Sequence, residues 1–395
     1  MNRKRIITWI LAMAILLISE FQQIGVFDAK ELKNSNMSWE GRLVEVFEKQ
    51  IELMCQLEEE STGKPADELR ILSIERISDF EGNEYTLVEC APTGYMIYHN
   101  ESGVFVEYSP VTNSAYYNTT GERKYVGPNA YYISEERKKY RDILKDEKLN
   151  ASQVERLKNS SEKINDKLSE NKNADIINYV EGNTDIGLAE IYGDSITYAS
   201  TRTVTEGEWK YVNGYEFFAN LNQCGYIGGG KCGYIAAAML LTYDEVVNGI
   251  DTVPNGWYEQ ISEKEYQIDP AFATRLYNMG VESGHGASTT SGEIHDTVNT
   301  WLARRMLTAN HISLYVPTQA ASKIKALINE NRPVIWFGDI WDNTYSNESA
   351  GFHAIVIYGY RNVWYSNEFV AHFGWNNATK VYFTGILGSM YSYEW

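Results

Sequence analysis

Short apolar runs separated by turn residues dominate the chain from about residue 68 to residue 118. Four runs rich in β-branched and aromatic residues cover positions 71–77, 85–90, 94–98 and 103–108. Runs of this length, bounded by Gly, Asn and Pro, are typical of strands joined by tight turns. The pattern therefore predicts a small antiparallel sheet.

The chain changes character between residues 134 and 172, where Lys and Glu become frequent. Its apolar residues follow helical spacing there, at Val154, Leu157, Ile164 and Leu168. Ser152 precedes Glu155 by three residues, which is the spacing of a capping box. We expect one or two amphipathic, solvent-facing helices, and we expect the polar stretch 169–175 to be an exposed linker that a protease could reach.

The amino terminus has the layout of a secretory signal. A basic start (Arg3, Lys4 and Arg5) precedes the apolar run 6–18, in which only Thr8 is polar. This run is shorter than the ~20 apolar residues that cross a bilayer. We therefore expect a secreted or extracellular protein with no stable membrane span, anchored in the membrane only if the leader is not cleaved.

Composition and charge narrow the classes of function. The chain has 395 residues, of which 44% are hydrophobic and 22% charged, as in globular proteins. Asp and Glu outnumber Lys and Arg by 53 to 35, which gives a formal charge of -18. Such a chain is a poor partner for nucleic acid phosphates. Its four cysteines lack the paired spacing of a structural zinc site and are too few for a disulfide framework.

Cys232 follows a glycine-rich loop, 228–231, and opens the Ala-rich run 232–241. This order predicts that Cys232 lies at or near a helix N-terminus, where the helix dipole favours the thiolate and activates it as a nucleophile. A buried core cysteine is the alternative. The residues from Gly225 to Lys231 also fit the spacing of a phosphate-binding loop, but a thiol in place of Ser or Thr is a poor magnesium ligand.

Six histidines occur, and His353 best fits a base for a cysteine nucleophile, which needs a rigidly held imidazole distant in sequence. It precedes the apolar β run 354–360. Residues 326–337 predict a helix that leads into a strand, and further β runs follow at 369–373 and 380–383. We expect an antiparallel meander that carries His353. A histidine that merely fills the core or the surface of a strand is the alternative.

The order of these motifs resembles that of the papain-like cysteine peptidases. The motifs are Cys232-Gly with its Ala-rich helix, Leu327-x-x-x-x-Arg-Pro-Val-Ile, Gly351-x-His-Ala-Ile-Val and the turn Phe373-Gly-Trp. Among these peptidases the chain looks most similar to streptopain-like and related clostridial secreted enzymes, and residues 92–109 resemble their inhibitory propeptide. The resemblance implies an α+β fold, in which a papain-like catalytic domain, with a central helix packed on an antiparallel sheet, follows a small β-rich pro-domain and a charged helical linker.

The resemblance also implies roles for individual residues. Cys232 would be the nucleophile, and His353 the general base and then the acid. The oxyanion hole would consist of the Cys232 backbone N–H and a side-chain amide, for which Gln223 is our prediction and Asn222 the alternative. His372 stands where the family has an orienting Asn, so we expect it to accept a hydrogen bond from His353. Activity should then fall as His372 gains a proton near pH 6 to 7.

These interpretations divide the chain into four parts: a signal peptide (1–29), a pro-domain that is β-rich from about residue 68 (30–133), a charged helical linker (134–202) and a papain-like peptidase domain (203–395). The expected partners are a peptide or protein substrate and the chain's own pro-region as inhibitor. No metal or organic cofactor is required. Two other functions stay open: a non-catalytic cell-surface binding module on the same scaffold, and an acyltransferase that uses an amine in place of water.

Overall fold

The computed structural model describes residues 38–62, 65–128, 130–136, 139–144, 146–184, 187–192, 209–221, 224, 231–286, 290–312, 317–338, 353–363, 366–375, 378–384 and 389–394. The predicted leader, residues 1–29, lies outside this part of the chain. Within it, every helix is too short or too polar to cross a membrane.

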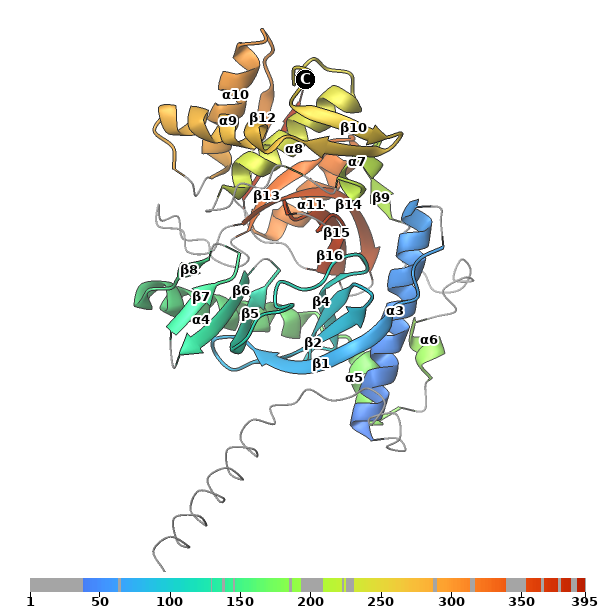
Figure 1. Cartoon of the computed structure of the whole chain (residues 1–395). Coiled ribbons are helices and arrows are strands. Elements are labelled where there is room, and N and C mark those ends of the chain that lie inside the picture. Colours follow the sequence, from blue (N-terminus) through green and yellow to red (C-terminus); the bar gives the residue numbers. More distant parts are fainter. Residues whose placement is uncertain are drawn as a thin grey trace, which may run out of the picture.

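The N-terminal region, described between residues 38 and 192, is a sheet flanked by helices (Figure 1). Its strands are β1 (Arg70–Ser78), β2 (Glu84–Ala91), β3 (Tyr95–His99), β4 (Val104–Ser109), β5 (Glu122–Gly127), β6 (Ala130–Glu136), β7 (Lys139–Asp142) and β8 (Glu147–Lys148). Its helices are α3 (Trp39–Thr62), α4 (Ala151–Glu170), α5 (Ala174–Glu181) and α6 (Leu188–Tyr192). β1, β2, β3 and β4 pair antiparallel in chain order, so the predicted small sheet is confirmed.

The predicted helical segment starts later than the sequence pattern suggests. The end of β6 and the whole of β7 and β8 lie between residues 134 and 148, and these strands end the sheet on this side. Their charged composition is that of edge strands, which carry charges because one side has no strand to pair with. The helix begins at Ala151 and is capped by Asn150 and Gln153 in a reciprocal capping box, so the predicted cap at Ser152 and Glu155 is wrong by two residues.

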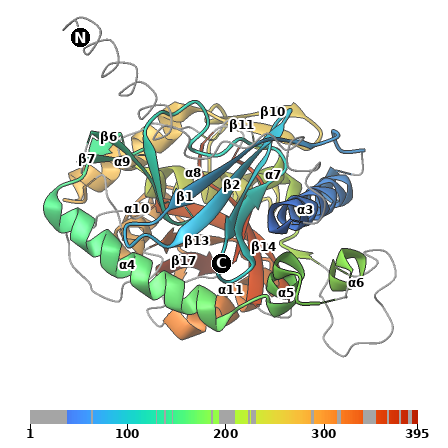
Figure 2. The same cartoon turned by 90° about the horizontal axis from the view of Figure 1, so that it is seen from below.

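The predicted linker is packed against the N-terminal region rather than separate from it. Leu157, Ile164 and Leu168 of α4 are buried, as their helical spacing implies. The stretch predicted to be exposed, 169–175, runs from the end of α4 to the start of α5, and only Asn173 in it is buried. The Asn173 N–H donates to the Ser102 carbonyl over 2.7 Å. Figure 2 shows α4 and α3 at opposite sides of β1 and β2. We therefore assign α4 and α5 to the N-terminal region.

The C-terminal region, described between residues 209 and 394, wraps a central helix with a sheet and further helices. Its helices are α7 (Glu216–Ala219), α8 (Cys232–Val246), α9 (Pro270–Glu282), α10 (Ser291–Ala303) and α11 (Pro317–Asn329). Its strands are β9 (Lys210–Tyr211), β10 (Tyr258–Ser262), β11 (Glu265–Ile268), β12 (Asn310–Ile312), β13 (Val334–Gly338), β14 (His353–Val363), β15 (Ser366–His372), β16 (Val381–Thr384) and β17 (Ser389–Glu394). β13, β14, β15 and β16 form the predicted antiparallel meander, and α8 packs on β13 and β14.

The two regions share one sheet. Its order is β12-β17-β13-β14-β15-β16-β4-β3-β2-β1-β5-β6-β7-β8, so β4 of the N-terminal region pairs with β16 of the C-terminal region. Tyr108 lies opposite Tyr382, and Glu107 opposite Phe383. The rings of Tyr108 and Tyr382 stack at 5.2 Å and both are fully buried. We call this junction the seam.

Lys380, just before β16, ties the seam to α3. Its ammonium lies 2.7 Å from the Glu58 carboxylate, with side chains only 5% and 18% exposed respectively. Its carbonyl accepts a hydrogen bond of 2.7 Å from the Ser109 hydroxyl of β4. Burial lowers the pKa of Lys380, and Glu58 opposes that shift. The pair is therefore a desolvated contact between regions, in which each charge depends on the other.

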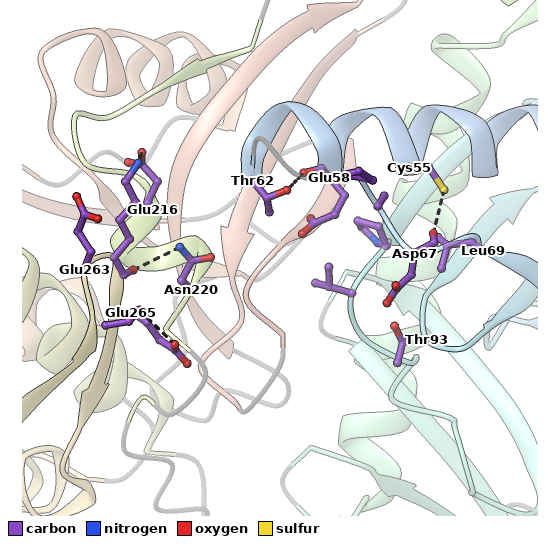
Figure 3. Close-up of a pocket in the computed structure, with 16 residues that line it drawn as sticks. Cys55, Glu58, Thr62, Asp67, Leu69, Thr93, Glu216, Asn220, Glu263 and Glu265 are labelled. Carbon is purple, nitrogen blue, oxygen red and sulfur yellow. Dashed lines mark hydrogen bonds and ion pairs between the residues drawn. The ribbon is translucent and has the colours of Figure 1, made fainter.

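An open cavity of about 810 Å³ lies beside the seam (Figure 3). One wall comes from the end of α3 and the segment before β1, with Glu58 and Asp67; the other comes from α7 and the β10–β11 hairpin, with Glu216 and Glu265. Cys232 is not among the described lining residues. The two regions thus face each other across the cavity with acidic side chains. They pair closely at the seam beside it.

Candidate functional site

Cys232 is the first residue of α8, as the sequence predicts, with Lys231 at the N-cap position. Its side chain is partly exposed, whereas residues 233–244 are buried along the helix. The glycine-rich loop that precedes it, 225–230, lies outside the described residues. The sulfur is therefore held at the start of a buried helix, where the positive end of the helix dipole favours an anion.

The decisive contact joins Cys232 to the strand that begins at His353. The backbone N–H of Ala354 donates a hydrogen bond to the Cys232 sulfur over 3.2 Å. β14 begins at His353, which pairs with Gly338 of β13, so the strand is anchored on its far side as well. The described part of His353 is its backbone and does not include the imidazole. Its backbone is one residue from the contact, although it follows Cys232 by 121 positions.

The first turn of α8 is braced from the side opposite the sheet. The Lys231 ammonium lies 4.5 Å from the ring centre of Tyr277 in α9. The Tyr234 hydroxyl donates to the Gly286 carbonyl over 3.0 Å. A side chain at Gly280 would place its Cβ 2.3 Å from that hydroxyl, so the small residue makes room for Tyr234. α9 and the segment after it therefore help fix the start of α8.

The other three cysteines differ from Cys232 in position or burial, and none of the four is in a disulfide. Cys224 is fully buried, and burial raises its pKa to about 12. Cys90 is also buried, with a pKa raised to about 12 by burial first and by Glu89 and Cys55 second. Cys55 lies within α3, where its thiol faces the Asp67 carbonyl at 3.6 Å. Of the four cysteines, Cys232 therefore combines a partly exposed side chain with a position at a helix N-terminus.

His372 is fully buried at the end of β15 and makes two hydrogen bonds to backbone groups. Its Nε2 lies 2.8 Å from the Leu221 carbonyl, and its Nδ1 lies 2.9 Å from the Gly374 N–H. An amide N–H can only donate and a carbonyl can only accept, which assigns the neutral tautomer with the proton on Nε2. Both nitrogens are thus engaged, and neither is left to accept from His353. The predicted orienting role of His372 does not agree with this geometry.

The expected acid titration of His372 disagrees with the structure for a related reason. Burial lowers the pKa of His372 to about 4, and the hydrogen bond with Leu221 opposes that shift only in part. A charged imidazole would also lose the acceptor that the Gly374 N–H requires. His372 therefore stays neutral at pH 6 to 7, and a loss of activity in that range would have another origin.

The predicted oxyanion-hole residues, Gln223 and Asn222, lie outside the described residues. Leu221 and Cys224, which bracket them, are both fully buried. The contacts that our sequence reasoning missed involve the Ala354 N–H and the Leu221 carbonyl. Every residue carries such backbone groups, so no residue type marks them in the sequence.

Comparison with known proteins bears on part of the chain. Residues 215–380 match the Peptidase_C39 like family. This segment runs from the residue before α7 to the residue before β16, and it contains Cys232, His353 and His372. The match supports a papain-like type of cysteine peptidase for this segment, and the mixed helices and strands of the C-terminal region agree with it. No curated protein matches the chain.

Proposed function

We propose that the protein is a secreted cysteine peptidase made as a zymogen, with Cys232 as the nucleophile and His353 as its base. The observation that carries the proposal is the 3.2 Å hydrogen bond from the Ala354 N–H to the Cys232 sulfur. It joins Cys232, at a helix N-terminus, to the start of the strand whose first residue is His353. The family match over the same segment supports the reaction class. The streptopain-like relationship is part of this proposal and rests on the motifs.

The reaction follows from these positions. His353 takes the proton of the Cys232 thiol, and the resulting thiolate attacks the carbonyl carbon of a peptide bond. The oxyanion that forms accepts hydrogen bonds from the Cys232 N–H and from a side-chain amide at Gln223 or Asn222. The C–N bond then breaks, and the leaving amine takes a proton from His353. His353 next removes a proton from water, the hydroxide attacks the thioester, and Cys232 leaves as thiolate. No metal or organic cofactor takes part.

The N-terminal region is the inhibitory pro-region in this proposal. Its attachment supports the idea, because β4 extends the sheet at β16 and Glu58 pairs with Lys380 next to that strand. The connection between α6 and β9, residues 193–209, is the covalent link between the regions. Cleavage there would leave the N-terminal region held by the seam alone, and its departure would yield the active enzyme.

The test uses the full chain and its Cys232→Ala variant, with casein and a mixture of fluorogenic peptides as substrates. We expect the wild-type protein to hydrolyse them after incubation, and the variant to be inactive but folded. Mass spectrometry of the products distinguishes the alternatives. Amine adducts without hydrolysis would indicate an acyltransferase. Specific peptide binding with no cleavage, together with slow alkylation of Cys232, would indicate a binding module.

A further inference from the structure

His372 connects two segments that are far apart in the sequence. Leu221 precedes it by 151 positions, whereas Gly374 follows it by two. Its neutral ring is a donor at one nitrogen and an acceptor at the other, so it satisfies one buried backbone carbonyl and one buried backbone amide at once. Loss of the ring would leave both groups without these partners.

Both segments lead to the start of α8. Leu221 is fully buried, and Asn222, Gln223 and the fully buried Cys224 follow it directly. Gly374 has a φ of 83°, and a Cβ built there would lie 3.7 Å from the Ile235 side chain in the first turn of α8. One nitrogen of the ring therefore holds Leu221, in the segment that precedes Cys232 in the chain. The other nitrogen holds the turn after β15, which packs on the first turn of α8.

We propose that His372 is a positioning residue that holds Leu221 in register with the turn at Gly374, and thereby fixes the first turn of α8, which begins at Cys232. The inference rests on the proposed peptidase function. It gives His372 a role in the position of the nucleophile at the start of α8 rather than in the proton state of His353.

Two variants separate this role from an orienting role. The amide of His372→Gln reaches the place of Nε2, so it keeps a donor for the Leu221 carbonyl. The amide of His372→Asn reaches only the place of Nδ1, so it keeps an acceptor for the Gly374 N–H and loses Leu221. A positioning role predicts that Gln is the better substitute. An orienting role predicts that Asn is the better substitute.

The experiment uses the full-length protein after incubation and measures kcat, KM and the pH profile of Cys232 alkylation by iodoacetamide. We expect His372→Asn to lower kcat at least tenfold, with KM within about twofold, and His372→Gln to recover most of the loss. The alkylation midpoint should stay in place in both variants, because the pairing of Cys232 with His353 is untouched. His99→Gln is the matched control, since His99 is also fully buried but belongs to the N-terminal region, where it contacts Ser102.

A measurement that does not depend on activity tests the role of His372 separately from the proposed function. If Leu221 is released, the buried Cys224 thiol should react with a maleimide under native conditions in His372→Asn but not in His372→Gln. The inference is overturned if Cys224 stays protected in both variants, if Asn substitutes better than Gln, or if the alkylation midpoint moves. Full hydrolysis by Cys232→Ala would instead refute the proposed function, while the Cys224 measurement would still judge His372.

Discussion

The N-terminal and C-terminal regions both combine a sheet with flanking helices, and each holds a fully buried titratable residue, Glu107 in one and His372 in the other, whose partners differ in kind. In the N-terminal region, the fully buried Glu107 accepts hydrogen bonds from the hydroxyls of Tyr95, Tyr125 and Tyr131. All three partners are side chains of the same sheet. In the C-terminal region, His372 bonds two backbone groups instead.

This difference separates a structural network from one that builds a site. The network around Glu107 joins residues of β3, β4, β5 and β6 and stabilises the interior of one region. The contact of His372 joins Leu221, which precedes α8, to the end of β15, and the contact of the Cys232 sulfur joins the first residue of α8 to the start of β14. Buried polar contacts to the backbone of separate loops set the geometry of those loops, which is what a catalytic site requires.

The largest expected effect tests whether the chemistry belongs to the C-terminal region alone. Cys232→Ala should lower peptide hydrolysis by about a thousandfold or more, because the nucleophile is lost while little packing changes. Cys224→Ala and Cys90→Ala remove buried thiols and should keep activity in whatever fraction folds. Initial rates per folded molecule, with folding followed by circular dichroism, provide the measurement. Equal losses at Cys224 or Cys90 would contradict the assignment.

The next effect tests whether the two regions are held together by the seam. A specific protease site inserted between residues 193 and 208 allows the folded chain to be cut, and we expect the pieces to elute together. Glu58→Gln removes the negative charge that faces the buried Lys380 ammonium, which should weaken the association by about 3 kcal/mol, or roughly a hundredfold.

Size-exclusion chromatography over a dilution series checks this expectation, together with the peptidase activity that appears on dissociation. Glu52→Gln is the control, because Glu52 pairs with Lys49 on the exposed part of the same helix. Similar dissociation of the Glu52→Gln and Glu58→Gln proteins would mean that the buried Glu58–Lys380 pair does not strengthen the association of the two regions. Full activity of the undissociated pieces would contradict inhibition by the N-terminal region.

A smaller effect concerns how the stability of each region depends on pH. Burial raises the pKa of Glu107 to about 7, against the lowering effect of its three tyrosine partners. The folded state therefore keeps this proton while the unfolded chain releases it near pH 4.5, so the stabilisation is full below pH 4.5 and is lost as the pH rises through 7. For His372 the sign is opposite: its contribution is full above pH 6.5 and is lost as the pH falls through about 4.

Hydrogen exchange of β4 and β15 peptides between pH 4 and pH 8 measures the two trends separately. Glu107→Gln should remove about 3 kcal/mol of the decline in stability of the N-terminal region with rising pH and leave the β15 profile unchanged. His99 shares the direction of His372, since burial also lowers its pKa to about 4, so wild type and variant are compared at each pH. Identical β4 profiles for both proteins would refute the role of Glu107.

The smallest effect concerns the start of α4, whose cap the sequence pattern placed two residues too late. Asn150→Ala removes the side chain that accepts from the Gln153 N–H, and should cost about 1 kcal/mol of stability in the N-terminal region. Ser152→Ala should be nearly neutral, because the sequence-predicted cap at Ser152 is not used. Urea unfolding followed at the tyrosines checks both variants, and a larger loss at Ser152 would contradict the observed cap.

Local patterns were sufficient to predict much of the fold. Alternating apolar runs predicted β1 to β4 and β13 to β16, and the glycine loop before an Ala-rich run placed Cys232 at the start of α8. Strands and helix starts depend on residues that are adjacent in the chain, so a single sequence contains the patterns that predict them. The same logic failed at residues 134–148, because charged edge strands and amphipathic helices have similar compositions.

Tertiary structure alone decided how these elements meet. The sequence determined the residue types that could carry the chemistry at Cys232 and His353, and the order of the elements that hold them. It did not determine that the Ala354 N–H reaches the sulfur, that His372 bonds Leu221, or that β4 joins β16. These contacts use backbone groups and strand edges, which are nearly identical for every residue. Their pairing depends on how distant segments pack rather than on any local pattern.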